Sequence, residues 1–463
     1  MSAQPSATEA LAGLWRLAGL PAQALRHVHL TGTDPVYPSS FAVATAAQST
    51  IAAAALAACE LGHARGVARQ EVQVDAVHAA AECQAWFRID GRVPELWDKF
   101  SGLYPARDGW VRIHANFAHH RAGALRLLGL DPATADRPDA ERAVRGWDAL
   151  ALEQAAAEAG LVVAALRSFA QWDASEAGRA IAAQPLITLT RIGDAPPREL
   201  PPLTGQQRPL EGLRVLDFTR ILAGPVGGRA LAAYGADVML VNAPHLPNIE
   251  AIADTSRGKR SVLLDLRTEA GRATLDPLVQ AAHVFVQGYR PGAIEGLGYG
   301  AQALAQRRPG IVCVSLSAYG TQGPWGGRRG YDSLVQTATG FNLAEAQAAG
   351  DPARPRPLPM QILDEATGYL VAFGAAAALW RQQREGGSWH VQVSLAQTGH
   401  WLRRLGRVAE GFAVTPPALE PFQETTATAW GALCALRHSA HLSRTPARWS
   451  RPSERPGDSP PRW

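Results

Sequence analysis

The chain has 463 residues, of which 47% are hydrophobic, and a net charge of +4. That length supports a large core and more than one domain. The basic residues are spread along the chain without forming a patch, which disfavours nucleic-acid binding. The cysteines, Cys59, Cys83, Cys313 and Cys434, form no Cys-x-x-Cys pair. We therefore expect reduced thiols, with neither a disulfide framework nor a zinc site.

The N-terminus shows no targeting signal. Residues Met1 to Ser6 lack the charged and apolar segments of a signal peptide. The longest apolar run, Ile51 to Cys59, is too short to cross a bilayer. We expect a cytoplasmic protein that does not engage a membrane.

Residues 1–205 form the first of three expected regions. It is rich in alanine near its start, and it ends in a linker between Asp194 and Glu211 that contains five prolines. We expect helices at 39–61, 147–159 and 173–183 and short strands at 71–74 and 110–116. The mixture predicts a smaller α+β domain.

Residues 206–345 form the second and most regular region. Short β-branched runs alternate with helical segments, which predicts a doubly wound, Rossmann-like parallel sheet covered on both faces. We expect strands at 213–218, 236–241, 261–266, 283–287 and 311–316, and helices at 226–234, 269–281 and 301–306. The fold class is α/β.

Residues 346–463 form the third region, which contains a faint internal repeat. Residues 389–393 (Trp-His-Val-Gln-Val) and residues 70–74 (Gln-Glu-Val-Gln-Val) each follow an alanine-rich helix and a glycine-containing turn. The repeat pairs Val72 with Val391 and indicates two related copies. The tail after Ser443 is rich in Pro, Arg and Ser, and we expect it to be extended.

Three glycine-containing loops follow strands of the predicted sheet. In parallel sheets ligands bind outside the carboxyl ends of the strands, so these loops predict a pocket. For any single loop, an ordinary βα turn is the alternative. The candidate contacts in these loops are Arg220, Ala223 and Gly224, then Tyr289 and Arg290, then Gly320 and Tyr331. The first loop has no Gly-x-Gly-x-x-Gly pattern, and neither a Walker motif nor Gly-x-Ser-x-Gly occurs.

A histidine cluster at His114, His119 and His120 raises the question of a metal site. The spacing fits no common site and no carboxylates flank it. We expect a polar strand end and no metal.

The ordered segments of the second region resemble the class III CoA-transferase family, which includes formyl-CoA and carnitine-CoA transferases and related acyl-CoA racemases. Each motif is weak alone, but together they extend over more than a hundred residues. The matching segments are Leu213–Phe218 with Ala223–Pro225, Tyr234–Val238, Arg257–Ser261 with Leu264–Leu266, Tyr289–Gly292, Tyr319–Pro324 and Gly330–Asp332.

The resemblance implies that Asp332 is the catalytic aspartate. It would attack an acyl-CoA thioester and pass through an aspartyl anhydride and an aspartyl-CoA thioester to a carboxylic acid acceptor. Coenzyme A is then a co-substrate, and no metal is involved. The resemblance also places Arg257, Lys259 and Arg290 near the CoA phosphates. The alternatives are a helix cap for Asp332, before a helix that starts at Ser333, and solvated surface charge for the basic residues.

Several departures from the family pattern keep other functions open. Asn242, Gly288 and Leu222 replace residues that the family often has in the CoA-binding loops. A catalytically silent CoA-binding or partner subunit is therefore the main alternative. Racemases pair the aspartate with an upstream histidine, and none occurs between His283 and His390. Racemisation or isomerisation is therefore disfavoured.

The order of the parts differs from that of the family, in which the α/β domain comes first. Residues 39–202 resemble the later part of a family member, and 361–399 repeat the middle segment in shortened form. This predicts a permuted fold or two incomplete tandem copies. We expect no counterpart of Asp332 in the first copy, and so one site per chain. Family members form interlocked dimers, which implies a homodimer here.

Overall fold

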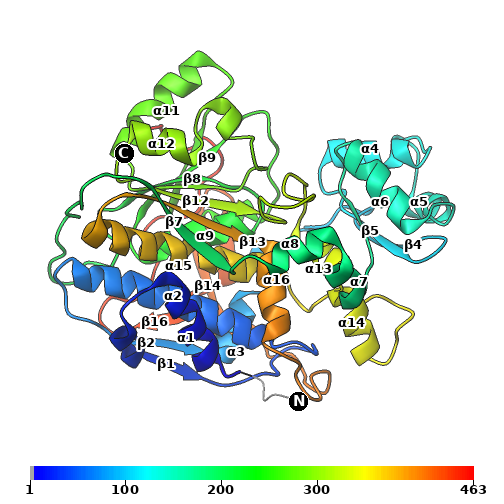
Figure 1. Ribbon diagram of the computed structural model, residues 1–463, viewed down its shortest axis with the longest axis horizontal. Helices are drawn as coiled ribbons and strands as arrows, with labels where there is room; N and C mark the ends of the chain where they lie inside the picture. Colours follow the sequence, from blue (N-terminus) through cyan, green and yellow to red (C-terminus); the bar gives the residue numbers. More distant parts are fainter. Residues whose placement is uncertain (1–4) are drawn as a thin grey trace.

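The computed structural model describes residues 5–463 and centres on a seven-stranded sheet (Figure 1). Its order is β10 (Lys259–Leu263), β9 (Asp237–Asn242), β8 (Arg214–Phe218), β11 (Val284–Gln287), β12 (Val312–Ser317), β13 (Ser388–Ser394) and β7 (Ile187–Gly193). All neighbours are parallel except β7, which runs antiparallel to β13. The predicted parallel α/β sheet is confirmed, with strand bounds shifted by one to three residues.

Both faces of the sheet are covered, as the continuous apolar strands predict. On one face Val215, Val286 and Val314 pack with α9 (Ala223–Ala233) and α15 (Ile362–Glu385). On the other, Leu216 and Phe285 pack against α11 (Glu269–Ala281) and α12 (Ala301–Arg307). Alternate residues of each strand thus belong to two separate hydrophobic cores, one on each face of the sheet.

The internal repeat is a duplicated unit in three dimensions. Val43 starts α2 (Val43–Ala64) as Ile362 starts α15, and Val72 and Val391 follow at the same spacing. β2 (Val72–Asp75) leads into α3 (Ala76–Glu82) as β13 leads into α16 (Leu395–Arg404). The two long helices α2 and α15 pack directly on each other.

The two copies pair with their neighbouring strands in the same way. β13 lies between parallel β12 and antiparallel β7, and β2 lies between parallel β1 (Val28–Thr31) and antiparallel β16 (Ala440–Leu442). Val391 pairs with Val314 and Leu189, and its counterpart Val72 pairs with Val28 and Leu442. This agreement favours two incomplete copies over a single permuted one.

Helices α2 and α15 are also long and apolar enough, by length and composition, to cross a bilayer. In the structure the most apolar stretch of each is wholly buried inside the protein. A helix that is apolar all round is stable where protein surrounds it on every side.

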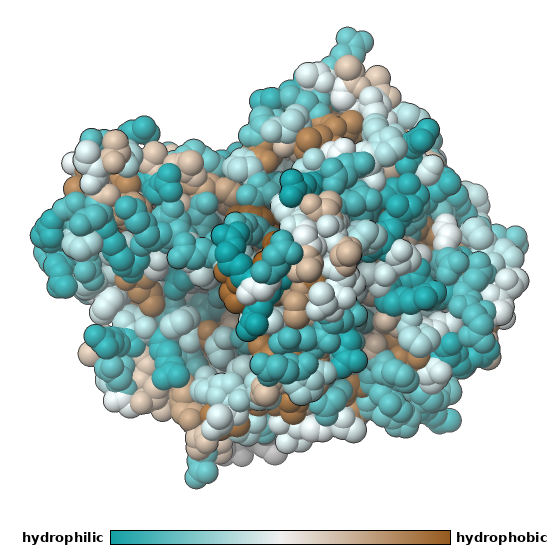
Figure 2. All heavy atoms as spheres, turned by 180° about the vertical axis from the view of Figure 1, so that it is seen from behind, coloured by the Kyte–Doolittle hydropathy of each residue, from teal (hydrophilic) through white to brown (hydrophobic). Residues whose placement is uncertain are grey.

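A small lobe from the N-terminal region stands to one side of the main body (Figure 1, cyan). Its antiparallel sheet comprises β4 (Gly102–Pro105), β5 (Trp110–Ile113) and β6 (Val163–Ala165), with α4 (Ala118–Leu127), α5 (Arg137–Val144) and α6 (Ala149–Glu158). The outer face of β6 contacts α13 (Asp332–Thr339) through Val162 and Ala164. Seen from behind, the surface between lobe and body is hollowed, with apolar residues inside hydrophilic rims (Figure 2).

The remaining elements complete the body. The expected helix at 173–183 is broken at Ser175, which ends one helix and caps the next. The tail after Ser443 has no helix or strand and runs over the surface, as predicted. The elements are α1 (Ala7–Ala18), β3 (Phe87–Ile89), α7 (Phe169–Ala174), α8 (Glu176–Ala182), α10 (Ile252–Thr255), α14 (Phe341–Ala348), β14 (Gln423–Thr428) and β15 (Gly431–Leu436).

Helices α9 and α15 cross so closely that only glycine fits at Gly368. A Cβ there would lie 2.5 Å from the carbonyl oxygen of Ala223. We expect Gly368→Ala to lower the free energy of unfolding by about 1–3 kcal/mol, because the backbone must shift. The control Gly296→Ala, where a Cβ meets nothing, should change it by less than about 0.5 kcal/mol. Equal values for the two variants in urea denaturation would contradict this close crossing.

Candidate active site

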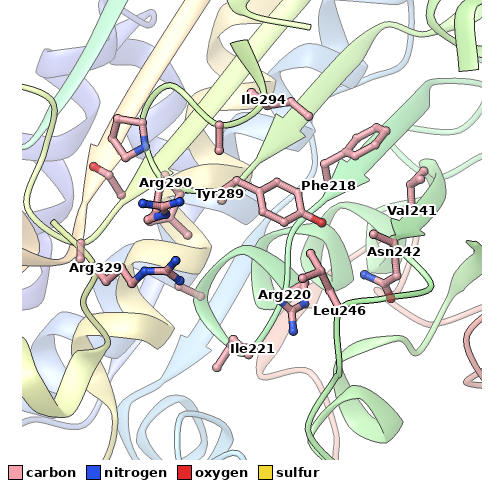
Figure 3. Close-up of a pocket in the computed structure, with 18 of the residues that line it drawn as sticks. Phe218, Arg220, Ile221, Val241, Asn242, Leu246, Tyr289, Arg290, Ile294 and Arg329 are labelled. Carbon is pink, nitrogen blue, oxygen red and sulfur yellow. The ribbon is translucent and has the colours of Figure 1, made fainter. Parts of the chain in front are cut away.

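A cavity of about 480 Å³ opens at the carboxyl ends of the central strands, where a parallel sheet binds its ligands. Loops after β8, β9, β11 and β12 form its walls (Figure 3). Five of the predicted contact residues line it: Arg220, Ala223, Tyr289, Arg290 and Tyr331. The structure thus brings these five residues together around one cavity.

Positive charge gathers on one side of the cavity. Figure 3 shows the side chains of Arg290 and Arg329 near each other, with Tyr289 extending across the middle. Burial and the charge of Arg290 lower the pKa of Arg329. No described residue forms an ion pair with either guanidinium. Two unpaired arginines side by side favour an anionic ligand. Arg329 was not predicted, although it stands three residues before Asp332.

Asp332 lies directly behind this cavity and is completely buried. Its Oδ2 accepts a hydrogen bond from the backbone N–H of Asp364 at 2.9 Å, and its Oδ1 accepts one from Gln336 Nε2 at 2.6 Å. The first N–H groups of α15 therefore point at the carboxylate, as helix N-termini do toward anions. Asp332 caps α15, so the alternative in which it caps its own helix is wrong.

Burial raises the pKa of Asp332 to about 6. The backbone N–H groups of Asp364 and Leu363, the Gln336 amide and the charge of Arg112 act in the opposite direction. A carboxylate with such a pKa is mostly ionised at neutral pH and is a stronger base than an exposed aspartate.

Asp364 is a second carboxyl group in the site, and it reaches the cavity wall. Burial, and then the charge of Asp332, raise the pKa of Asp364 well above its usual value. Each of the two carboxyl groups therefore disfavours ionisation of the other, and Asp332 is the one that accepts helix N–H groups that favour its charged form. Sequence analysis missed Asp364. The available signal was the pair Asp364-Glu365 at the start of an alanine-rich, apolar helix.

The small lobe covers this carboxyl pair from the other side. The ring of His114 stacks on Tyr331, with 3.9 Å between ring centroids. Phe117 and His120 pack nearby, and both ring nitrogens of His120 are buried without a partner among the described residues. Burial lowers the pKa of His114 to about 3 and that of His120 to about 4, so both are neutral. The histidine cluster forms a roof over Tyr331.

Four other predicted contact residues lie away from the cavity lining. Lys259 is wholly buried beneath α9, where its Nζ donates to Asp217 Oδ2 and to the carbonyl of Pro225, both at 2.8 Å. Arg257 pairs with Asp254 and lines a different cavity. Gly320 lines a third, smaller cavity. Gly224 lies in the first turn of α9 and packs against Thr219, which precedes the helix. Lys259 is internal because it links the sheet to α9, whereas Arg260 is partly exposed and pairs with Asp237.

The first copy contains an unexpected counterpart of Asp332. The carboxylate of Asp34 accepts the N–H groups of Ala44 and Thr45 at 3.0 and 2.8 Å, the second and third residues of α2. Asp332 caps the same two positions of α15. Asp34 is thus a counterpart of Asp332 in its capping contact, and the expectation of one site per chain stays a prediction. Thr45 stands where the second copy has Asp364, so no second carboxyl pair forms.

Comparison with known proteins gives a consistent result. A model of CoA-transferase family III matches residues 210–405. An acyl-CoA transferase of Gibberella moniliformis is 30% identical over 377 residues, which cover 73% of this chain and 66% of that protein. The "probable fatty acyl-CoA transferase Rv3272" of Mycobacterium tuberculosis is 34% identical over 237 residues, 47% of this chain and 59% of its own length.

A crystal structure of Rv3272 in its orthorhombic form shares 34% sequence identity and covers 43% of this chain and 59% of its own, with a TM-score of 0.39. This chain spans less than two thirds of the length of the curated relatives named above.

The sheet, the cavity at its strand ends and the buried aspartate behind it define an α/β protein with a candidate carboxylate nucleophile. Residues 210–405 of the chain belong to the class III CoA-transferase family.

The buried ion pair of Lys259 and Asp217 tests whether Lys259 is structural. We expect Lys259→Met to lower the free energy of unfolding by about 3–5 kcal/mol, because it leaves the Asp217 charge buried alone. Lys99→Met, at the only other lysine and on the surface, should change it by less than about 0.5 kcal/mol. Chemical denaturation measures both. Unchanged stability of Lys259→Met would contradict this assignment.

Proposed function

We propose that this chain transfers coenzyme A between an acyl-CoA thioester and a carboxylic acid. The observation that carries the proposal is the buried Asp332 carboxylate, held by the N-terminus of α15 behind a cavity with unpaired arginines. The names of the two curated relatives support an acyl-CoA as the donor. The homodimer and the cytoplasmic location expected from the sequence stay predictions.

The reaction uses Asp332 as a covalent carrier. Its carboxylate attacks the thioester carbonyl, the C–S bond breaks, and a mixed anhydride and CoA thiolate form. The thiolate attacks the aspartyl carbonyl, giving an aspartyl-CoA thioester and releasing the donor acid. The acceptor carboxylate then attacks that thioester and displaces the thiolate, forming a second anhydride. Attack of the thiolate on the acceptor carbonyl yields the new acyl-CoA and restores Asp332.

The surroundings of Asp332 suit this sequence. The N–H groups of Leu363 and Asp364 fix the carboxylate in one orientation. Less entropy is therefore lost when the carboxylate reacts with the bound thioester. Complete burial keeps water from the anhydrides. Arg290 and Arg329 supply positive charge for the anionic CoA. Since Asp332 has no exposed surface, Tyr331 or Asp364 must move before a thioester reaches it.

A catalytically silent CoA-binding subunit is the second candidate, and Asp34 favours it. Asp34 caps α2 as Asp332 caps α15, which shows that capping alone gives an aspartate a role at this position. In this alternative the cavity binds CoA, and Asp332 only stabilises α15.

Trapping separates the two candidates. We expect incubation with acetyl-CoA, succinyl-CoA and longer acyl-CoAs, followed by hydroxylamine, to convert Asp332 to a hydroxamate that mass spectrometry locates. The variant Asp332→Asn should give no adduct, while the exposed control Asp351→Asn should react like the unaltered protein. CoA binding without an adduct for any thioester would favour the silent subunit. An adduct at Asp364 would move the nucleophile to that residue.

The pH dependence of adduct formation follows from the raised pKa of Asp332, about 6. Only the ionised carboxylate attacks, so the rate should rise about tenfold per pH unit below 6 and level off above 7. Single-turnover measurements between pH 4.5 and 8 give the profile. A plateau that extends down to pH 4.5 would show an ordinary, exposed carboxylate instead.

A further inference from the structure

Arg112 is a buried arginine whose guanidinium lies over the ring of Trp97, 5.3 Å from the ring centroid, but has no hydrogen-bond acceptor among the described residues. Arg112 is 8% exposed, and its Nε is buried from solvent. The other three buried arginines of the described chain, Arg65, Arg229 and Arg257, all bond to carbonyl or carboxylate oxygens. A buried cation without a hydrogen-bond acceptor is costly, which makes it a candidate for binding an anionic ligand.

The position of Arg112 brings it to the carboxyl pair. In the register of β5 and β6 it pairs with Ala164 and so shares the face of the lobe that contacts α13. Asp332 is the first residue of α13, and the charge of Arg112 acts on its carboxylate. His114, which directly follows β5 and is two residues after Arg112, stacks on Tyr331. Arg112 thus approaches Asp332 from the small lobe.

Neither Asp332 nor the proposed CoA cavity supplies a hydrogen-bond acceptor for the guanidinium of Arg112. Both Asp332 oxygens already accept hydrogen bonds, from Asp364 N–H and from Gln336, and neither accepts one from Arg112. Arg290 and Arg329 line the cavity at the strand ends, whereas Arg112 does not. A ligand that accepts hydrogen bonds from Arg112 would therefore lie beside Asp332, where the proposed exchange places the acid.

We propose, on the basis of the CoA transfer proposed above, that Arg112 binds a second carboxylate of the exchanging acid, so that the acid is a dicarboxylate. The carboxylate that reacts loses its charge when it becomes an anhydride or thioester, so a cation fixed on it would favour the reactant. A second carboxylate keeps its charge throughout. Pairing Arg112 with it holds the acid without opposing the reaction.

The test measures acid binding separately from turnover. Calorimetry compares succinate, glutarate and adipate with the monocarboxylates butyrate and valerate. We expect at least one dicarboxylate to bind the unaltered protein more tightly than the monocarboxylates. Arg112→Gln should weaken that binding about 10- to 100-fold, the size expected for hydrogen bonds to a charged group. Arg112→Lys should recover part of it, and Arg126→Gln, on the exposed face of the same lobe, should leave it unchanged.

Two further readouts separate this role from others. With acetyl-CoA, which has no second carboxylate, Arg112→Gln should still form the Asp332 adduct. In transfer assays the variant should raise KM for the dicarboxylate with little change in kcat.

Other outcomes overturn the inference. One is equal binding of mono- and dicarboxylates, and another is unchanged dicarboxylate binding in Arg112→Gln. The third is an equal loss of kcat with every acid, which would show that Arg112 acts on Asp332 and not on the acid. If the acids bind as expected but no thioester labels Asp332, the binding inference stands and the proposed transfer fails.

Discussion

The first N–H groups of α15 have no partner within the helix, and the helix is buried along nearly its whole length. Buried donors must be satisfied, so this end of the helix requires an acceptor from elsewhere. The Asp332 carboxylate meets that requirement, and it is closed off from solvent as a result. The same contact joins α13 to α15 and places the candidate nucleophile behind the cavity. Stability and the candidate chemistry thus depend on one interaction.

The duplicated unit shows which parts of this arrangement are general. Asp34 caps α2 as Asp332 caps α15, so the capping belongs to both copies. The parallel sheet with its arginine-lined cavity and the second carboxyl group, Asp364, belong to the second copy alone. The small lobe, from the N-terminal region, covers the second copy's site. One candidate site is thereby assembled from the lobe and the second copy, which lie on either side of the linker.

Local patterns predicted much of this structure. Continuous β-branched runs gave the parallel sheet, because strands covered on both faces need no polar alternation. Loops at strand ends gave Arg220, Tyr289 and Arg290, because connectivity alone puts those loops at one edge. The resemblance supplied Asp332, which these patterns alone described only as a turn carboxylate.

What the sequence did not predict depends on contacts between distant segments. Lys259 sits in a run of charged residues typical of a surface, and only the position of α9 makes it internal. Arg112 and Asp332 belong to regions separated by the linker, and no local pattern pairs them. The position of Asp364 arises from the meeting of two helix N-termini, α13 and α15, and burial together with the nearby Asp332 charge raises its pKa.

The most direct test of the central claim, that Asp332 carries the acyl group and CoA in turn, follows oxygen atoms. In the proposed sequence the acceptor acid leaves one of its carboxylate oxygens on Asp332 when its acyl group departs with CoA. Multiple turnovers with an acceptor labelled with oxygen-18 should therefore place the label in the peptide that contains Asp332. Turnover that leaves this peptide unlabelled would contradict the account.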